Sequence, residues 1–118
     1  MSPDDQPVNS HRDGEGAVHY DQGKTRVELL PIGPLMGAAE VFTLGAQKYA
    51  ERNWEKGMRW GRLYASLLRH LWEWWRGRDF DQETGKHHLD HATCCLLMLR
   101  QTVQERGDLD DRPGAGDG

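Results

Sequence analysis

Histidines and carboxylates gather in one stretch of the chain, RHLWEWWRGRDFDQETGKHHLDHATCC. His70 and Glu73 are three residues apart, and His88 and His91 repeat the same spacing further along. Side chains three residues apart are neighbours on one face of a helix. Two adjacent antiparallel helices can turn such pairs toward each other, which is how metal sites in helical bundles are assembled. The pattern therefore predicts a divalent-metal site between two helices.

A second set of possible ligands accompanies these pairs. His87 and Asp90 have the same spacing as His88 and His91, and spacing alone leaves both registers open. Asp81 and other carboxylates lie between the two predicted helices. Mixed carboxylate and imidazole donors suit Mg²⁺ or Mn²⁺ with a phosphate ligand, whereas a larger share of imidazole favours Mn²⁺, Co²⁺ or Zn²⁺. We therefore expect Mg²⁺ or Mn²⁺, with another divalent metal as the alternative.

The two cysteines, Cys94 and Cys95, are adjacent in sequence. Neighbouring cysteines do not readily meet the geometry of a disulfide. The sequence shows neither a secretory signal nor an apolar run long enough to cross a membrane, which predicts a reduced, cytoplasmic protein. We interpret both cysteines as small apolar core residues. A zinc site that uses His91 and Cys95, four residues apart, is an alternative.

A second group of candidate residues lies upstream, in GAQKYAERNWEKG and in GKTR. Lys48 can hold a phosphate, Trp54 offers a ring face to a base, and Asn53 presents both a donor and an acceptor to a base edge. Trp54 could instead be a core or interface anchor. Lys24 and Arg26 resemble a phosphate-contacting loop, but the spacing of a P-loop is absent.

Three amphipathic segments would position these residues. Apolar residues recur with helical spacing over about 33–51, 61–76 and 86–106. Gly77 suits the end of the second helix, and Glu83 and Thr84 suit the start of the third. No strand pattern or internal repeat appears, so the predicted class is all-α, a small bundle of about three helices.

The two ends of the chain differ in composition from its middle. Residues 1–20 and 107–118 are polar, with acidic and glycine-rich stretches, and we predict that both are disordered tails. The folded domain is then 21–106, which is short for burying a complete core. We expect a second copy to complete that core, as a homodimer or a homotetramer.

Charge is distributed unevenly along the sequence. The net charge is −4, which argues against stable nucleic-acid binding. Residues 48–78 are nevertheless rich in Lys and Arg, among them Arg69. A basic segment beside acidic residues suits a phosphate-bearing ligand held with a metal. We therefore include Arg69 among the candidate phosphate contacts.

The motifs occur in an order that resembles a known family. DxGKxR, LLP, GAxKYxxxNWxxG and RHLxxWxxGxDxDxETGxxHLxHA follow one another across residues 21–99. This set is similar to the small phage-type dATP/dGTP diphosphohydrolases, MazZ-like enzymes related to MazG and the all-α nucleoside triphosphate pyrophosphohydrolases. The resemblance implies metal-dependent hydrolysis of a purine deoxynucleoside triphosphate to the monophosphate and pyrophosphate, by a helical oligomer.

The resemblance also implies roles for particular residues. The substrate contacts would be Lys24, Arg26, Lys48, Asn53 and Trp54. Metal and phosphate would lie among His70, Glu73, Asp81, His88 and His91, with Asp90 as a ligand in the other register and with Glu73 and Asp81 as the catalytic carboxylates. MazG enzymes carry ExxE on one helix and ExxD on the next, so this chain has fewer carboxylates than that pattern.

Two other functions compete with this interpretation. One is a non-enzymatic helical module that binds a nucleic acid or a protein partner through the Trp- and Arg-rich segment. The other is a histidine-aspartate metal phosphohydrolase, which needs an adjacent His-Asp pair and a longer helical chain. Here the order at Asp90 and His91 is reversed and the chain is short.

Overall fold

The computed structural model describes residues 10–13, 17–20 and 23–114, and the chain divides into two units, Met1–Leu30 and Pro31–Gly118. In the first unit, β1 (Ser10–Asp13) and β2 (Ala17–Tyr20) pair antiparallel, with Ser10 opposite Tyr20, and a 3₁₀ turn, η2, spans Val27–Leu29. Neither strand is predicted from the sequence, because four residues are too few to show a clear alternation. Residues 1–9 of the predicted N-terminal tail lie outside the described residues.

The second unit is built from three helices, as the sequence predicts. They are α1 (Ile32–Tyr49), α2 (Trp60–Trp75) and α3 (His88–Glu105), with short 3₁₀ turns η3 (Asn53–Lys56) and η4 (Gly107–Leu109). The protein is therefore an all-α bundle with a small hairpin in its first unit. Within the described part, no helix combines the length and apolar character that crossing a membrane requires.

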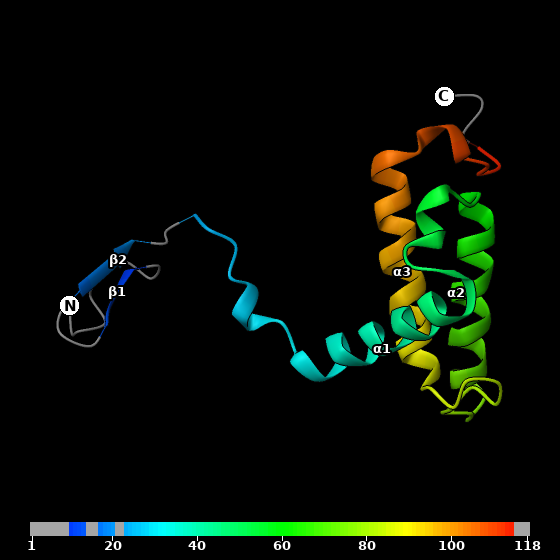
Figure 1. Ribbon diagram of the computed structural model, residues 1–118, viewed down its shortest axis with the longest axis horizontal. Helices are drawn as coiled ribbons and strands as arrows, with labels where there is room; N and C mark the ends of the chain where they lie inside the picture. The colour runs from blue at the N-terminus through cyan, green and yellow to red at the C-terminus, as the bar shows by residue number, and fades with distance from the viewer. Residues whose placement is uncertain (1–9, 14–16, 21–22, 115–118) are drawn as a thin grey trace. The chain divides into compact units, whose positions relative to one another are not determined.

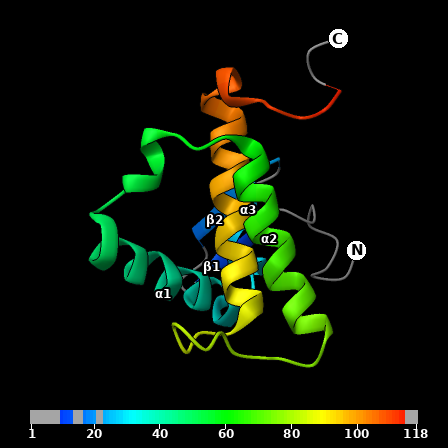
Figure 2. The same ribbon diagram turned by 90° about the vertical axis from the view of Figure 1, so that its right-hand side faces the viewer.

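Helices α2 and α3 lie side by side along their length, and α1 runs across α3 (Figures 1 and 2). The buried apolar residues come from all three helices: Ala38, Val41, Trp60, Leu63, Ala92, Cys94 and Cys95. Cys95 also donates its thiol hydrogen to Ser66 Oγ on α2, with 3.3 Å between the sulfur and oxygen atoms. Because α2 packs on α3, His70 of α2 lies beside His88 at the start of α3.

The connection between α2 and α3 is closed at both ends by backbone hydrogen bonds. Gly77 follows α2 at a φ of +94°, where a glycine is favoured, and so ends the helix as predicted. The N–H of His88 donates to the carbonyl of Asp79 at 2.7 Å, and that of Asp81 donates to Lys86 at 2.8 Å. The loop is therefore held against the first turn of α3.

The start of α3 differs from the predicted one. The N-cap is His87, whose Nδ1 accepts the N–H of Leu89 at 3.0 Å, rather than a residue near Glu83 or Thr84. An imidazole nitrogen is an unusual capping group, because Ser, Thr, Asp and Asn are the common ones. Those two residues belong instead to the turn that precedes the helix.

Part of the C-terminal segment, which the sequence predicts as a disordered tail, contacts the first turn of α2. Residues 107–114 include the 3₁₀ turn η4, and Asp111 Oδ1 accepts the N–H of Gly61 in the first turn of α2 at 2.7 Å. The guanidinium of Arg112 lies 5.0 Å from the centre of the Trp60 ring. An acidic segment is favoured here because a helix N-terminus attracts a carboxylate. Composition alone does not reveal this contact.

Candidate metal and nucleotide site

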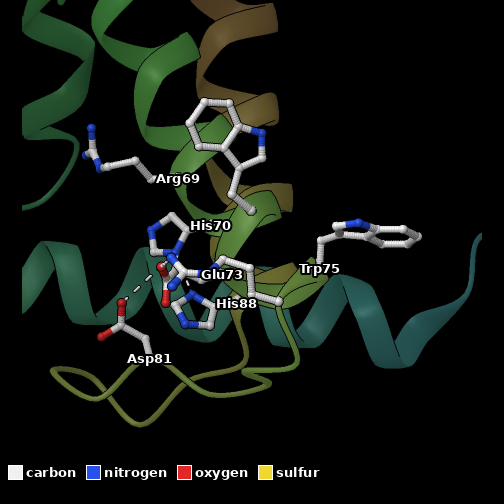
Figure 3. Close-up of a pocket in the computed structure, with 8 residues that line it drawn as sticks. Arg69, His70, Glu73, Trp75, Asp81 and His88 are labelled. Carbon is white, nitrogen blue, oxygen red and sulfur yellow. Dashed lines mark hydrogen bonds and ion pairs between the residues drawn. The ribbon is translucent and has the colours of Figure 1, made fainter.

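Three possible metal ligands meet where α2, α3 and the connecting loop converge. His70 lies on α2, His88 lies in the first turn of α3, and Asp81 lies in the loop between them. The Nδ1 atoms of the two histidines are 2.9 Å apart, and His70 Nδ1 lies 4.0 Å from Asp81 Oδ2. One ligand atom from each residue falls within 4.8 Å of the other two. We call these three residues the donor group (Figure 3).

The donor group fits a six-coordinate divalent ion. Two nitrogens bound at about 2.1 Å and at right angles to each other lie about 3 Å apart, close to the separation between His70 and His88. Two imidazoles and one carboxylate are also a recurrent ligand set for divalent transition metals with open positions. All three side chains line a cavity of about 510 Å³, so a bound ion would face space for a substrate.

The loop fixes the carboxylate of Asp81. Its Oδ1 accepts the backbone N–H groups of Glu83 at 2.7 Å and Thr84 at 3.0 Å. Burial by itself would raise the pKa of Asp81, but these N–H groups and the nearby histidines outweigh it and lower the pKa. The carboxylate is therefore ionised at neutral pH, with Oδ2 on the side of His70.

Two histidines of the cluster, His70 and His91, are held in the neutral form. Burial, together with the positive charges that His91 and His88 would carry, lowers the pKa of His70 from 6.5 to about 4. Burial is also the largest cause of the lowered pKa of His91. A neutral imidazole is the form that binds a metal.

His91 stands beside the donor group without being part of it. Its ring stacks on that of His70, with the ring centres 4.4 Å apart and the planes only 5° from parallel. Its Nε2 lies 2.7 Å from Thr84 Oγ1. The predicted pair of His88 and His91 therefore faces His70, as the sequence analysis expected of one of its two registers.

The residues of the other register, His87 and Asp90, lie outside the donor group. His87 caps α3 and packs edge-on against Phe80. Asp90 points toward α1, so closely that a Cβ atom on Gly37 would lie 2.5 Å from its carboxylate. Asp90 was predicted as a metal ligand, but the donor group does not include it.

Glu73 borders the cavity but is engaged in ion pairs. Its carboxylate contacts Arg78 at 2.6 Å and Arg76 at 3.3 Å. The hydrogen bond from Arg78 is the main cause of its lowered pKa. Glu73 was predicted both as a ligand and as a catalytic carboxylate, yet the donor group lacks it. Its side chain is oriented by the two arginines.

The cavity is also lined by residues that were not predicted from the sequence. Trp72, Trp75 and Arg76 line it together with Arg69, which was predicted as a phosphate contact. Trp75 is 80% exposed and Trp72 is 62% exposed. Trp72 follows Arg69 by three residues and Arg76 follows Glu73 by three, and this helical spacing is the signal that could have identified these two.

A second cavity, of about 750 Å³, lies between the end of α1, η3 and the middle of α3. Asn53 and Trp54 line it as neighbours, and the Trp54 ring is tilted against Phe42 with the ring centres 6.0 Å apart. Lys48 is outside this lining and pairs with Glu83 of the α2–α3 loop at 3.5 Å. This ion pair connects α1 to the loop that carries the donor group's carboxylate.

The remaining predicted substrate contacts belong to the first unit. Lys24 is exposed there, and Arg26 is paired with Glu28 at 2.6 Å. The two cysteines are buried and free, as predicted for core residues. Burial raises the pKa of Cys95, and that of Cys94 to about 12, which opposes the thiolate that the alternative zinc site would need. The donor group contains neither cysteine.

The fold and the donor group together describe a small all-α protein with three side chains that could hold a divalent ion. Residues 14–112 match the family described as dATP/dGTP diphosphohydrolase, N-terminal, and the chain belongs to that family. A "dATP/dGTP diphosphohydrolase" of Salmonella phage PMBT28 is 35% identical over 95 residues, which cover 80% of this chain. The chain spans about a third of that relative's length, since the match covers 32% of it. No solved structure matches the chain.

Proposed function

We propose that this protein hydrolyses a purine deoxynucleoside triphosphate, dATP or dGTP, to the monophosphate and pyrophosphate in a metal-dependent reaction. The observation that carries the proposal is the donor group of His70, Asp81 and His88, placed on a cavity that also contains arginines. Family membership and the printed name of the phage relative supply the substrate class.

We propose Mn²⁺ as the preferred ion and Mg²⁺ as the alternative. Two of the three donors are imidazole nitrogens, and nitrogen donors favour transition metals over Mg²⁺, which prefers oxygen. A bound divalent ion polarises a phosphate and lowers the pKa of a coordinated water. His70, His88 and Asp81 would hold the ion, and the neutral state of His70 removes proton competition at physiological pH.

The protein's own residues orient the triphosphate. Arg69 lines the cavity and has no ion pair within the described part of the chain, so its guanidinium is available to a phosphate. Arg76 lines the same cavity and would exchange part of its contact with Glu73 for the substrate. These cations offset the negative charge on the departing pyrophosphate.

Glu73 is the carboxylate proposed to take a proton from the attacking water. It borders the cavity but contributes no atom to the donor group, which leaves it free of the ion. We expect Glu73→Gln to abolish turnover while the far-ultraviolet circular dichroism spectrum is unchanged. Glu105→Gln, an exposed change at the end of α3, is the matched control. Full activity in Glu73→Gln would exclude this residue from the chemistry and leave Asp81 as the catalytic carboxylate.

The nucleobase is proposed to bind the second cavity. Trp54 offers a ring face to the base, and Asn53 offers a hydrogen-bond donor and an acceptor. Lys48, near the end of α1 that borders this cavity, pairs with Glu83 of the loop that carries Asp81. Stacking on an aromatic ring contributes about 1–3 kcal/mol per base. Trp54→Ala should therefore raise the KM for dATP and dGTP by about 5- to 100-fold and leave kcat similar.

The exposed Tyr64 of α2 lines neither this cavity nor the first, so Tyr64→Ala is the control for Trp54→Ala. Trp75→Ala tests whether the base stacks instead on Trp75, which lines the first cavity beside the donor group. If Trp75→Ala raises the KM and Trp54→Ala does not, the base stacks in the first cavity and the assignment to the second is wrong.

We also propose that the protein acts as a homodimer or homotetramer in the cytoplasm, which is the host cytoplasm if a phage encodes it. Exposed apolar side chains on one helix support an interface between copies: Leu96, Leu97 and Val103 of α3. The phage origin of the relative supports the location. Lys24 and Arg26 are retained as proposed substrate contacts, on the family resemblance alone.

The proposed reaction is tested by product analysis. Purified protein would be incubated with each of the four dNTPs and GTP, in Mn²⁺, Mg²⁺ or chelator, and the products separated by chromatography. We expect a purine monophosphate and pyrophosphate in the presence of metal and no product with chelator. Release of tripolyphosphate, or loss of one phosphate at a time, would contradict the proposal. Absence of turnover with every metal would favour a binding module instead.

A further inference from the structure

We propose that His91 is a positioning residue rather than a metal ligand, and that Thr84 and His91 together orient the His70 ring toward the ion. This inference rests on the proposed metal site. Both the helical spacing and the family resemblance place His91 among the metal ligands, and this proposal gives it a different role. The geometry that supports it is a chain of contacts from the α2–α3 loop through His91 to His70.

The first step in this chain is the hydroxyl of Thr84. Its oxygen accepts the backbone N–H of Lys86 at 3.2 Å and lies 2.7 Å from His91 Nε2. Either atom of this pair can be the donor, according to the tautomer of His91. We assign the hydroxyl as the donor to Nε2, which occupies the lone pair of that nitrogen.

The second step follows from the chemistry of a neutral imidazole, which carries one hydrogen on one of its two nitrogens. With Nε2 of His91 accepting from Thr84, the hydrogen resides on Nδ1. Neither nitrogen of His91 then has a free lone pair for a metal. His70 and His88 differ from His91 because their two Nδ1 atoms share one hydrogen at 2.9 Å, which an ion bound to both nitrogens would replace.

The third step is the stack of His91 on His70. The terminal torsion of a histidine side chain has broad minima, so the plane of the ring needs an external restraint. His91 supplies one, since its ring lies parallel to that of His70 within 5° and at 4.4 Å. In this orientation His70 Nδ1 faces both His88 and Asp81.

The turn that begins at Asp81 contacts both the carboxylate of the donor group and the ring of His91. Thr84 donates its backbone N–H to Asp81 Oδ1, and its hydroxyl contacts His91. A single turn therefore fixes the carboxylate of the donor group and, through His91, the plane of one of its imidazoles. Residues that orient the ligands of a metal typically change its affinity about 10- to 100-fold when they are removed.

The first test measures Mn²⁺ affinity by isothermal titration calorimetry. Thr84→Val, which keeps the shape and removes the hydroxyl, should weaken binding about 10- to 100-fold, and Thr84→Ser should restore it. His91→Phe, which keeps a stacking ring without nitrogens, should weaken binding less than the matched change His70→Phe. Equal losses in His91→Phe and His70→Phe would show that His91 is a ligand and overturn the inference.

The second test does not depend on a bound metal. Long-range ¹⁵N NMR of the metal-free protein reports which nitrogen of each histidine carries the hydrogen. We expect His91 to be protonated at Nδ1, and we expect Thr84→Val to change that signal. Protonation at Nε2 would overturn the inference. If His91 is protonated at Nδ1 but the wild type binds no divalent ion, the proposed metal function fails while the arrangement of Thr84 and His91 stands.

Discussion

At the scale of single residues, the candidate site combines the neutral imidazole of His70 with one ionised carboxylate. Asp81 is held ionised by two backbone N–H groups, and His70 is held neutral by burial. Such a pairing needs no proton release before a cation binds. The sequence predicted both residues as candidate ligands, because few types of side chain bind a metal. It could not identify their partners.

The ion pairs of Glu73 and the turn that directs Thr84 to His91 were not predictable from the sequence. Spacing shows which side chains share a helix face, but not which of them faces the neighbouring helix. The two registers of the histidine run differ by one residue, about 100° around α3. Only the packing of α3 against both α1 and α2 determines that Asp90 points to Gly37 and His88 to His70.

Asp81→Asn tests the carboxylate directly. The amide keeps the size of the side chain but removes its negative charge, so a divalent ion should bind at least about 10-fold more weakly. Turnover should fall in parallel, with secondary structure retained. The measurement is Mn²⁺ titration followed by the rate of pyrophosphate release. An Asp81→Asn protein with unchanged metal affinity would remove this residue from the donor group.

The lowered pKa of His70 predicts a pH dependence of stability in the metal-free protein. Its pKa is 6.5 when unfolded and about 4 when folded, so below pH 6.5 the unfolded state binds more protons. The free energy of unfolding should therefore decrease as the pH falls from about 6.5 to about 4. Thermal unfolding with chelator present should show a falling Tm across this window. In His70→Gln the fall should be smaller, and an identical profile would contradict the assignment.

At the scale of elements, the three helices follow from apolar spacing, whereas their ends depend on local contacts. The predicted ranges overlap α1, α2 and α3 closely because an amphipathic helix is the strongest sequence signal. The cap of α3 by His87 and the contact of α2 with Asp111 involve unusual or distant partners. The sequence segment that contains Asp111 was predicted to be disordered, because composition does not register a single long-range hydrogen bond.

Removal of this contact should destabilise the bundle. Asp111 caps α2 by accepting the N–H of Gly61, and loss of such a cap costs about 1 kcal/mol. Asp111→Ala should lower the midpoint of urea unfolding. The control is Asp108→Ala, which removes only an exposed ion pair with Arg106 and should leave the midpoint nearly unchanged. Equal midpoints for the wild type and Asp111→Ala would show that the C-terminal segment does not stabilise α2.

At the scale of the whole molecule, few large side chains are fully buried. Within the described residues, no large side chain is less than 2% exposed. Leu96 and Leu97 of α3 are 53% and 46% exposed. A short chain buries a smaller fraction of its surface than a long one. Both the length of the sequence and the exposed face of α3 therefore point to the same proposal, an interface between copies.

A charge on that face tests the proposed interface. Leu97→Glu should shift the molecular mass measured by light scattering toward that of a single chain, because an unpaired charge at an apolar contact is costly. Gln104→Glu, exposed on the same helix, should keep the mass of the wild type. A wild-type protein that is already a single chain at micromolar concentration would contradict the proposed oligomer.

The most direct test of the account is a single Mn²⁺ titration in which bound metal, by electron paramagnetic resonance, and the rate of dATP or dGTP hydrolysis are measured together. The account predicts that the rate rises in proportion to the bound ion. It also predicts that His88→Ala, which removes one member of the donor group, moves both curves to higher Mn²⁺ by the same factor. Turnover without bound metal, or metal binding that His88→Ala leaves unchanged, would contradict the claim that His70, Asp81 and His88 form the metal site of a dNTP diphosphohydrolase.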